Sequence, residues 1–353
     1  MGNSSRIATF DVAKALVLLM VVGGHLVGNG IVANCNEWCD PYFANFKDGV
    51  TMPLFYMMSG YFSATSIRNG SWGKIIARTI GFLWPVAAFG VIFGFIIGLT
   101  GTKPLWKILL YPAARIAFGG WFLLTLAIIY SACAILVRLG RTDKQRLTLL
   151  LSFYVVLFFM PRGLPFHWSS NVLHMFPYFV FGVFVLRPYE IHKNMLVSVL
   201  CGIVLLAAIF FEGNCYTNGM SFYYVPSDWQ TVLSSAYLSF CVVARTVIGI
   251  VGSVFVLWLI DLLCHKFPSL DRLAFLGTTT LGIYVMHEWP LTQLKEFGCM
   301  SSPICGYWKW PLALGIFLLC HFLTVFIKNN AITSVVFFGS EKRLSECIDK
   351  LVL

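Results

Sequence analysis

The chain has 353 residues, of which 58% are hydrophobic and 11% are charged, and its mean hydropathy is +0.80. Soluble domains carry about 25% charged residues, so this composition excludes an ordinary soluble globular protein and predicts an all-α polytopic membrane protein. The formal net charge of +10 comes from basic residues in short segments between apolar runs. No basic patch is interleaved with aromatic residues, so we expect no nucleic-acid partner.

Ten apolar runs have a length near the 20 residues or so that a membrane-spanning helix needs. The first run lacks a small-residue cleavage site and many runs follow it, so it predicts a span rather than a signal peptide. Residues 228–263 are too long for one span, and we expect their first part to be an interfacial helix. The ten predicted spans are 7–31, 50–66, 79–100, 119–137, 147–160, 173–187, 194–212, 240–263, 273–291 and 311–328.

The positions of lysine and arginine predict the orientation of these helices. With the N-terminus in the cytoplasm, 16 of the 25 basic residues fall in inner segments and 7 in outer loops, while Lys14 and Arg245 lie inside spans. Cytoplasmic loops of membrane proteins are enriched in basic residues, so both termini are expected to be cytoplasmic. We expect one membrane domain over residues 1–340 and a short cytoplasmic tail over 341–353.

The cysteines follow the same predicted topology. Five of the eleven fall in predicted outer loops, where an oxidising compartment permits disulfides: Cys35, Cys39, Cys215, Cys299 and Cys305. Cys35 with Cys39, and Cys299 with Cys305, are spaced to close small loops, and unpaired thiols are the alternative. The spacing of cysteine and histidine resembles no metal site, so we expect no metal.

The first span, DVAKALVLLMVVGGH, carries three polar side chains. Lys14 and His25 are eleven residues apart, which puts them on one helix face, about 16 Å apart along the axis. Asp11 and Lys14 are spaced to form an ion pair. Snorkelling and the helix N-terminus are an alternative explanation for Asp11 and Lys14, and an interhelical hydrogen bond is one for His25. His25 follows Gly23 and Gly24, which permit close helix approach, and it is also a candidate general base.

Two later spans also carry polar side chains that are unfavourable in a bilayer. Arg245, in CVVARTVIGIVGSVFVLWL, needs an anionic partner or a ligand, and Asp11 is a candidate partner. His287 lies at the outer end of its predicted span beside Glu288, where an ordinary interfacial role is the alternative to a catalytic one. Tyr284 lies one helical turn before His287 and belongs either to the same site or to the aromatic belt.

Lys74 and Arg78 form a basic pair with a spacing of four residues at the predicted cytoplasmic face. Such a pair is either a signal of topology or a binding site for the phosphates of a nucleotide-like donor. The sequence contains no Walker loop, no dinucleotide fingerprint and no GxSxG elbow.

Seven segments, in order, resemble the acyltransferase 3 family of integral-membrane acyltransferases, particularly its fucose 4-O-acetylase-like branch. DVAKALVLLMVVGGH resembles the first-helix motif, MPLFYMMSGYF the second helix, and KIIARTIGFLWP the basic inner segment. The later landmarks are WFLLTLAIIY, FPYFVFGVFV, LGTTTLGIYVMHEWPL and KNNAITSVVFFG, and the resemblance covers residues 6–340. Lys14 departs from the commoner arginine, and Lys74 and Arg78 stand where a tighter basic run is common.

The resemblance implies a ten-helix enzyme in a bacterial cytoplasmic membrane, with no bound cofactor. It would take an acyl group, usually acetyl from acetyl-CoA, on the cytosolic side, and transfer it to a hydroxyl of a lipid-linked or surface carbohydrate. His25 would act as the general base. Lys74 and Arg78 would bind the CoA phosphates, and Lys14 would lie along the passage.

The remaining polar residues would support that reaction. Tyr284 or His287 would orient the acceptor or stabilise the oxyanion. Arg245 would hold donor or acceptor groups, or balance Asp11. The alternative is a glycan or lipid transporter or flippase without acyl transfer, which would also carry buried charges and broken helices. The absence of an internal repeat in the sequence and the histidine-centred motifs favour the enzyme.

Overall fold

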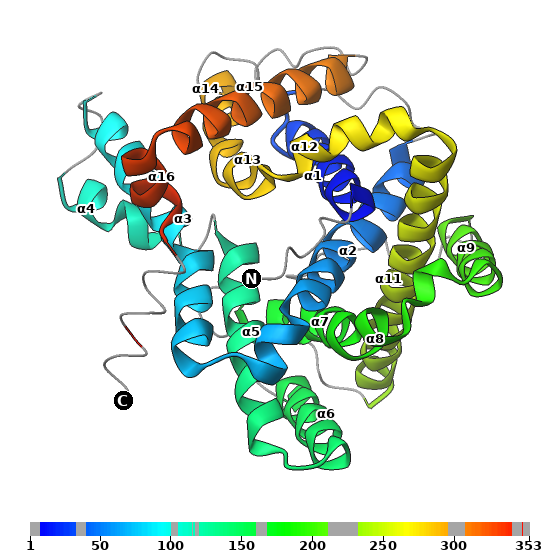
Figure 1. The fold of residues 1–353 in the computed structure, drawn as a ribbon. Helices are drawn as coiled ribbons and strands as arrows, with labels where there is room; N and C mark the ends of the chain where they lie inside the picture. Colours follow the sequence, from blue (N-terminus) through cyan, green and yellow to red (C-terminus); the bar gives the residue numbers. More distant parts are fainter. Residues whose placement is uncertain are drawn as a thin grey trace. The chain divides into compact units, whose positions relative to one another are not determined.

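A computed structural model describes residues 8–32, 40–99, 105–114, 116, 120–159, 168–210, 232–295, 308–340 and 348 (Figure 1). The chain divides into two compact units, each built from two stretches of sequence. The first unit comprises Met1–Met58 and Pro188–Val325, and the second comprises Ser59–Arg187 and Phe326–Leu353. The five cysteines considered for disulfides lie outside the described residues.

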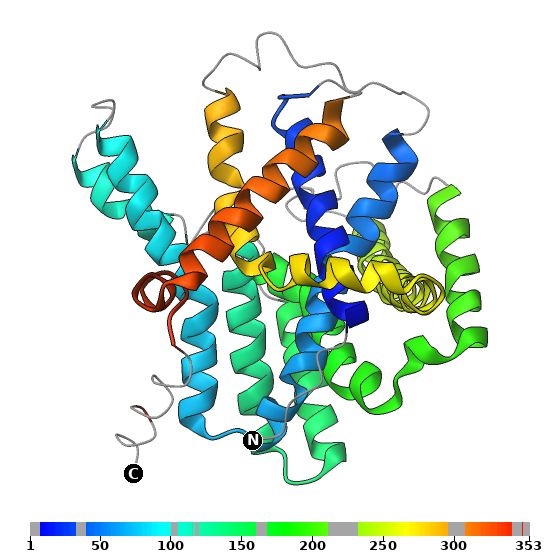
Figure 2. The same cartoon turned by 45° about the horizontal axis from the view of Figure 1, so that its top comes forward.

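The first unit is built around α1 (Ala8–Gly28) and the first half of α2 (Asp40–Asn69). Its other main helices are α9 (Met195–Phe210), α11 (Val232–Lys266) and most of α15 (Lys309–Asn329), and η4 (Ile191–Lys193) is a short 3₁₀ turn. Figures 1 and 2 both show α9 lying alongside α11, and the two helices are in contact. Residues 232–240, expected as an interfacial helix, are the first turns of α11.

The second unit contains the end of α2 and the helices that follow it. These are α3 (Trp72–Leu99), α4 (Leu105–Ala114), α5 (Trp121–Leu139), α6 (Asp143–Phe159), α7 (Trp168–Phe181), the π-helical turn η3 (Gly182–Leu186), the start of α8 (Arg187–Tyr189) and α16 (Ala331–Phe338). Helix α5 packs between α3 and α7, as Figure 2 shows. Local sequence accounts for the helix ends: Ser71 accepts a hydrogen bond from the Lys74 amide at the start of α3, and α5 ends before Gly140.

All ten predicted spans coincide with helical structure. Six described helices are long and apolar enough to cross a membrane, and Met195–Ile209 is a shorter apolar helix. The number of crossings and the orientation of the termini stay predictions. The six are Ala8–Gly28, Trp72–Ile96, Trp121–Leu139, Ser169–Tyr189, Val242–Lys266 and Lys309–Asn329.

The segment expected as one helix over 273–291 is divided into four short elements. They are η5 (Pro268–Leu273), α12 (Ala274–Gly277), α13 (Thr280–Met286) and α14 (Glu288–Leu294). The break coincides with three consecutive threonines, whose hydroxyls donate to carbonyls three residues earlier: Thr278 to Phe275 at 2.7 Å, Thr279 to Leu276 at 2.9 Å and Thr280 to Gly277 at 3.1 Å. Hydroxyl groups that compete for backbone carbonyls in this way bend or interrupt helices.

Helices α12 and α13 both pack on α1. The closest approach is at Gly277, where a Cβ atom would overlap the backbone oxygen of Asp11. A glycine is therefore required at this position by the space available. The contact fixes the broken segment against the N-terminal half of α1.

Substituting Gly277 with alanine should destabilise the protein by about 1–3 kcal/mol, because the added methyl group must displace one of the two backbones. The measurement is thermal unfolding of the purified protein in detergent. Gly315→Ala on α15 is the matched control, since a Cβ atom there meets nothing within 4 Å. Equal unfolding temperatures for the two variants would contradict this packing.

Candidate functional site

The residues singled out in the sequence fall into two groups, one in each unit. Within the first unit, the last turn of α1 brings His25 close to His287, which lies between α13 and α14. Their ring centroids are 5.3 Å apart and the ring planes meet at 44°. His25 is half-buried and His287 is only 1% exposed. The structure therefore brings together two of the three candidate catalytic residues from segments far apart in sequence.

The hydrogen bonds of His287 define what its ring can do. Its Nδ1 lies 2.6 Å from the carbonyl oxygen of Tyr284 and 3.3 Å from that of Ile283. Because a carbonyl only accepts, Nδ1 must carry the hydrogen, and Nε2 of the neutral ring is then a hydrogen-bond acceptor. This Nε2 is buried and has no partner among the described residues. The site thus contains a proton acceptor whose orientation is set by the backbone.

Tyr284, the third candidate catalytic residue, lies beside His287. The two ring centroids are 5.8 Å apart, and the Tyr284 side chain is half-buried. Its phenol hydroxyl is a hydrogen-bond donor of the kind that stabilises developing negative charge. Tyr284 is therefore near the histidine pair, as the spacing of one helical turn predicted.

Two glycines before His25 admit large side chains from other helices. A Cβ atom at Gly23 would lie 3.0 Å from the ring of Trp310 on α15. One at Gly24 would lie 3.0 Å from Cδ and 3.3 Å from Nζ of Lys47 on α2. Side chains from α15 and α2 therefore fill the space that this glycine pair leaves, and the close approach of a helix there stays a prediction.

Charged groups surround His25 that the sequence analysis did not assign to the site. His25 lies within electrostatic range of Lys47 and of Glu288 in the first turn of α14. Lys295 donates to Asn29, just past α1, at 3.2 Å. The sequence assigned the lysines of the outer loops to membrane topology only. The absence of a side chain at Gly24, which leaves room for Lys47, is the sequence feature that could have identified Lys47.

At the other end of α1, Asp11 and Lys14 form the predicted ion pair. The Lys14 Nζ lies 2.5 Å from the Asp11 carboxylate, and Asp11 is buried while Lys14 is half-buried. Between Lys14 and His25 the same helix face carries Leu18 and Val21, which are both buried. The helix face that carries Lys14 and His25 is therefore polar at its two ends and apolar between them.

Helix α11 contributes Arg245 and Asp261 to the first unit. Arg245 is 8% exposed, as expected for an arginine inside a span. Asp261 accepts a hydrogen bond from Thr9 at 2.8 Å, which ties α11 to the start of α1. His192 on η4 is buried nearby, with its ring edge-on to Phe10 at 5.6 Å between centroids.

The second group, Lys74 and Arg78, lies on α3 in the second unit. Arg78 is half-buried, its Nη1 lies 3.4 Å from the Ser66 hydroxyl, and its guanidinium lies over the ring of Tyr130, 5.5 Å from the centroid. The Tyr130 hydroxyl also donates to Ser66, at 3.1 Å. Lys74 is exposed. Of the two predicted donor-binding residues, Arg78 is the one that its neighbours hold in place.

A family model described as an acyltransferase domain matches residues 7–330, a stretch that runs through both units. The nodulation protein NolL of Sinorhizobium fredii is 34% identical over 87 residues, and that of Mesorhizobium japonicum is 32% identical over 87 residues. These alignments cover 24% of this chain and 24% and 23% of the relatives, so the chain spans about a quarter of each relative's length. No solved structure matches.

His192 lies outside the candidate spans, and its burial should make stability depend on pH. Burial lowers the pKa of His192 below its usual value of about 6.5, although the charge of Asp261 opposes that shift. The unfolded chain then binds the proton more readily than the folded protein does. The stability that the neutral His192 contributes is therefore fully present above its usual pKa and is lost as the pH falls toward the lowered pKa. His192→Asn should flatten the decline in unfolding temperature between about pH 7 and pH 5. His265→Gln, at an exposed histidine, is the control, and an unchanged slope in His192→Asn would contradict the assignment.

Proposed function

The chain belongs to the acyltransferase family whose model it matches over residues 7–330, and from that premise we propose that it is a membrane O-acetyltransferase. It moves acetyl from cytosolic acetyl-CoA to a hydroxyl group of a cell-surface or lipid-linked carbohydrate. The observation that carries this proposal is the pair of His25 and His287, which combines a half-buried imidazole with a buried imidazole of fixed orientation. Acylation of a hydroxyl group needs a base within hydrogen-bonding distance of that hydroxyl, and a neutral imidazole can serve as this base.

In the proposed reaction, His25 acts as the general base. It accepts the proton of the acceptor hydroxyl while the hydroxyl oxygen attacks the thioester carbonyl. The new C–O bond forms, the C–S bond then breaks, and the CoA thiolate leaves and takes the proton back from His25. His287 Nε2 accepts a hydrogen bond from the acceptor or from His25, and the Tyr284 hydroxyl faces the developing oxyanion.

The donor is proposed to bind through basic groups on the cytosolic side. Lys74 and Arg78 contact the phosphates of CoA, with Arg78 as the positioned member of the pair. Lys14 and its partner Asp11 lie along the path of the thioester. Arg245, buried in the same unit as His25, holds a donor or acceptor group.

The proposed cellular setting is a bacterial cytoplasmic membrane that the chain crosses ten times with both termini inside. The six described helices of spanning length and the charge bias of the loops support this arrangement. The two NolL relatives come from bacteria, which supports the compartment. Membership of the fucose 4-O-acetylase-like branch stays part of the proposal.

His25→Ala should lower acetyl transfer by about 10²–10⁴-fold with little change in donor binding, because the base acts only in the chemical step. The measurement is transfer from acetyl-CoA by the purified protein in nanodiscs, with thermal unfolding as the check on folding. His265→Gln, an exposed histidine at the end of α11, is the control and should keep full activity. Full activity in His25→Ala would remove His25 from the chemistry.

Transfer and transport predict different fates for an acetyl label. When vesicles carrying the protein receive acetyl-CoA labelled in the acetyl group, an acyltransferase labels the membrane glycan, whereas a flippase moves the glycan without labelling it. We expect labelling, and we expect surface glycans of a deletion strain to lack an acetyl signal in mass and proton NMR spectra. Glycan movement without label would favour the transporter.

A further inference from the structure

The last turns of α2, in the second unit, are surrounded by arginines. Arg78 reaches Ser66 from α3, and Arg138 reaches Gly70 from α5. Arg68 is on α2 itself, and the Arg187 guanidinium lies 4.6 Å from the ring centroid of Tyr61. We call these four residues the arginine cluster: Arg68, Arg78, Arg138 and Arg187.

Two members of the arginine cluster bind the same helix end about one turn apart. The Gly70 amide donates to the Ser66 carbonyl at 2.9 Å, so these two residues are successive along the helix surface. Arg78 contacts the Ser66 hydroxyl, and Arg138 Nη2 donates to the Gly70 carbonyl. The two guanidinium groups are thereby held on one face of α2.

Among the described residues, no carboxylate neutralises this cluster. In the described part of the chain, none of the four arginines forms an ion pair, and their contacts are aromatic rings, a hydroxyl and a carbonyl. The Arg138 guanidinium lies 4.3 Å from the ring centroid of Trp72. Positive charge gathered without a counter-charge favours an anionic ligand.

One buried charged atom at this helix end has no partner among the described residues. It is Nη1 of Arg138, whose Nη2 is held by the Gly70 carbonyl. The buried Ser63 hydroxyl is also unpaired, but it lies seven residues, about 10 Å along the axis, before Gly70 and therefore does not belong to the same site. A buried charged donor without a hydrogen bond is unfavourable, so Arg138 Nη1 points to a missing ligand.

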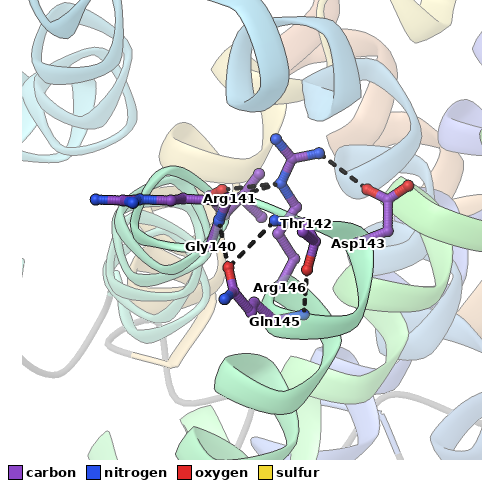
Figure 3. A network of polar contacts seen from close by, with 7 residues as sticks. Gly140, Arg141, Thr142, Asp143, Gln145 and Arg146 are labelled. Atoms are coloured by element: carbon purple, nitrogen blue, oxygen red, sulfur yellow. Dashed lines mark hydrogen bonds and ion pairs between the residues drawn. The ribbon is translucent and has the colours of Figure 1, made fainter.

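The neighbouring corner between α5 and α6 shows how this chain satisfies an arginine that serves structure alone (Figure 3). Arg146 forms an ion pair with Asp143 at 2.9 Å, and its Nε donates to the carbonyls of Val137 and Gly140 at 3.2 and 3.1 Å. Figure 3 also shows Gln145 accepting from the Arg141 and Thr142 amides. Arg138 lies one residue from this network but keeps one nitrogen unpaired.

We propose that Arg138 Nη1 binds a phosphate group at the end of α2, beside Arg78, and that this phosphate belongs to the nucleotide end of the acyl-CoA donor. The proposal rests on the proposed acyltransferase function and adds one binding residue to it. The guanidinium nitrogens of Arg138 and Arg78 donate to phosphate oxygens, and the remaining arginines supply long-range attraction. The site therefore selects CoA thioesters over thioesters that carry no phosphate.

The test compares two donors on the full-length protein in phosphatidylcholine nanodiscs. With acetyl-CoA, Arg138→Ala should raise KM about tenfold or more at nearly constant kcat, since it removes a charge-assisted hydrogen bond. With S-acetylpantetheine, which has no phosphate, wild type and variant should have equal kinetics. With acetyl-CoA, the KM of Arg138→Lys should lie between those of wild type and Arg138→Ala, because lysine keeps the charge but not the fork of nitrogens. Arg138→Lys replaces Arg138→Ala in the test if the alanine variant fails to fold.

Calorimetric binding of CoA, measured without any acceptor, separates this proposal from the proposed function. If no acceptor is acetylated but CoA binding falls about tenfold in Arg138→Ala, the function fails and the phosphate site stands. Lys144→Gln removes one exposed charge on α6 and should change nothing. Equal losses with both donors, or a loss in Lys144→Gln as large as in Arg138→Ala, would overturn the site. So would wild-type CoA binding in Arg138→Ala together with lost stabilisation by phosphatidylglycerol, which would assign the cluster to a lipid headgroup.

Discussion

The contact between Gly277 and the Asp11 backbone sets the arrangement on which the candidate catalytic groups depend. It fixes the start of the broken segment at the N-terminal half of α1, and the chain then follows α1 through α13 toward His287. His287 lies ten residues after Gly277, and His25 lies fourteen residues after Asp11 on α1. The two chain segments therefore bring the two histidines together. Both histidines are therefore positioned by backbone packing rather than by polar contacts between them.

The threonine turn makes this packing compatible with an apolar environment. A break in a helix frees backbone carbonyls, and in a bilayer these must be satisfied within the protein. Thr278, Thr279 and Thr280 supply the donors. Farther along the same segment, the carbonyls of Ile283 and Tyr284 in α13 hold Nδ1 of the His287 ring. The Ile283 carbonyl also accepts from the His287 amide at 2.9 Å, so the helical ladder continues to His287 while it orients the ring.

Much of this arrangement follows from sequence pattern. Apolar runs located the helices, and helical spacing predicted the Asp11–Lys14 pair. The small size of Gly23 and Gly24 indicated room for a neighbour, and side chains from other helices occupy that room. The family match confirms the acyltransferase resemblance, which rested on the order of weak motifs. Local periodicity could not predict the break at 278–280, because threonine hydroxyls also occur in unbroken helices.

The residues that sequence reasoning missed have one cause in common. Lys47 and Arg138 were counted as loop charges, and only tertiary contacts distinguish them from solvated lysines and arginines. The Lys47 side chain lies in the space at Gly24, close to His25. Arg138 is held against α2 by its hydrogen bond to the Gly70 carbonyl and by its contact with the Trp72 ring. A charge count reports which side of a membrane a loop prefers, but not which of its charged side chains contacts another helix.

The placement of unpaired groups separates two tasks within the proposed enzyme. Among the described residues of the first unit, the unpaired buried side-chain atoms are imidazole nitrogens of His192 and His287, which exchange protons. At the end of α2 the unpaired atom is a guanidinium nitrogen of Arg138, which binds anions without exchanging protons near neutral pH. The proposed proton chemistry and the proposed phosphate recognition thus use side chains of different kinds, each suited to its own task.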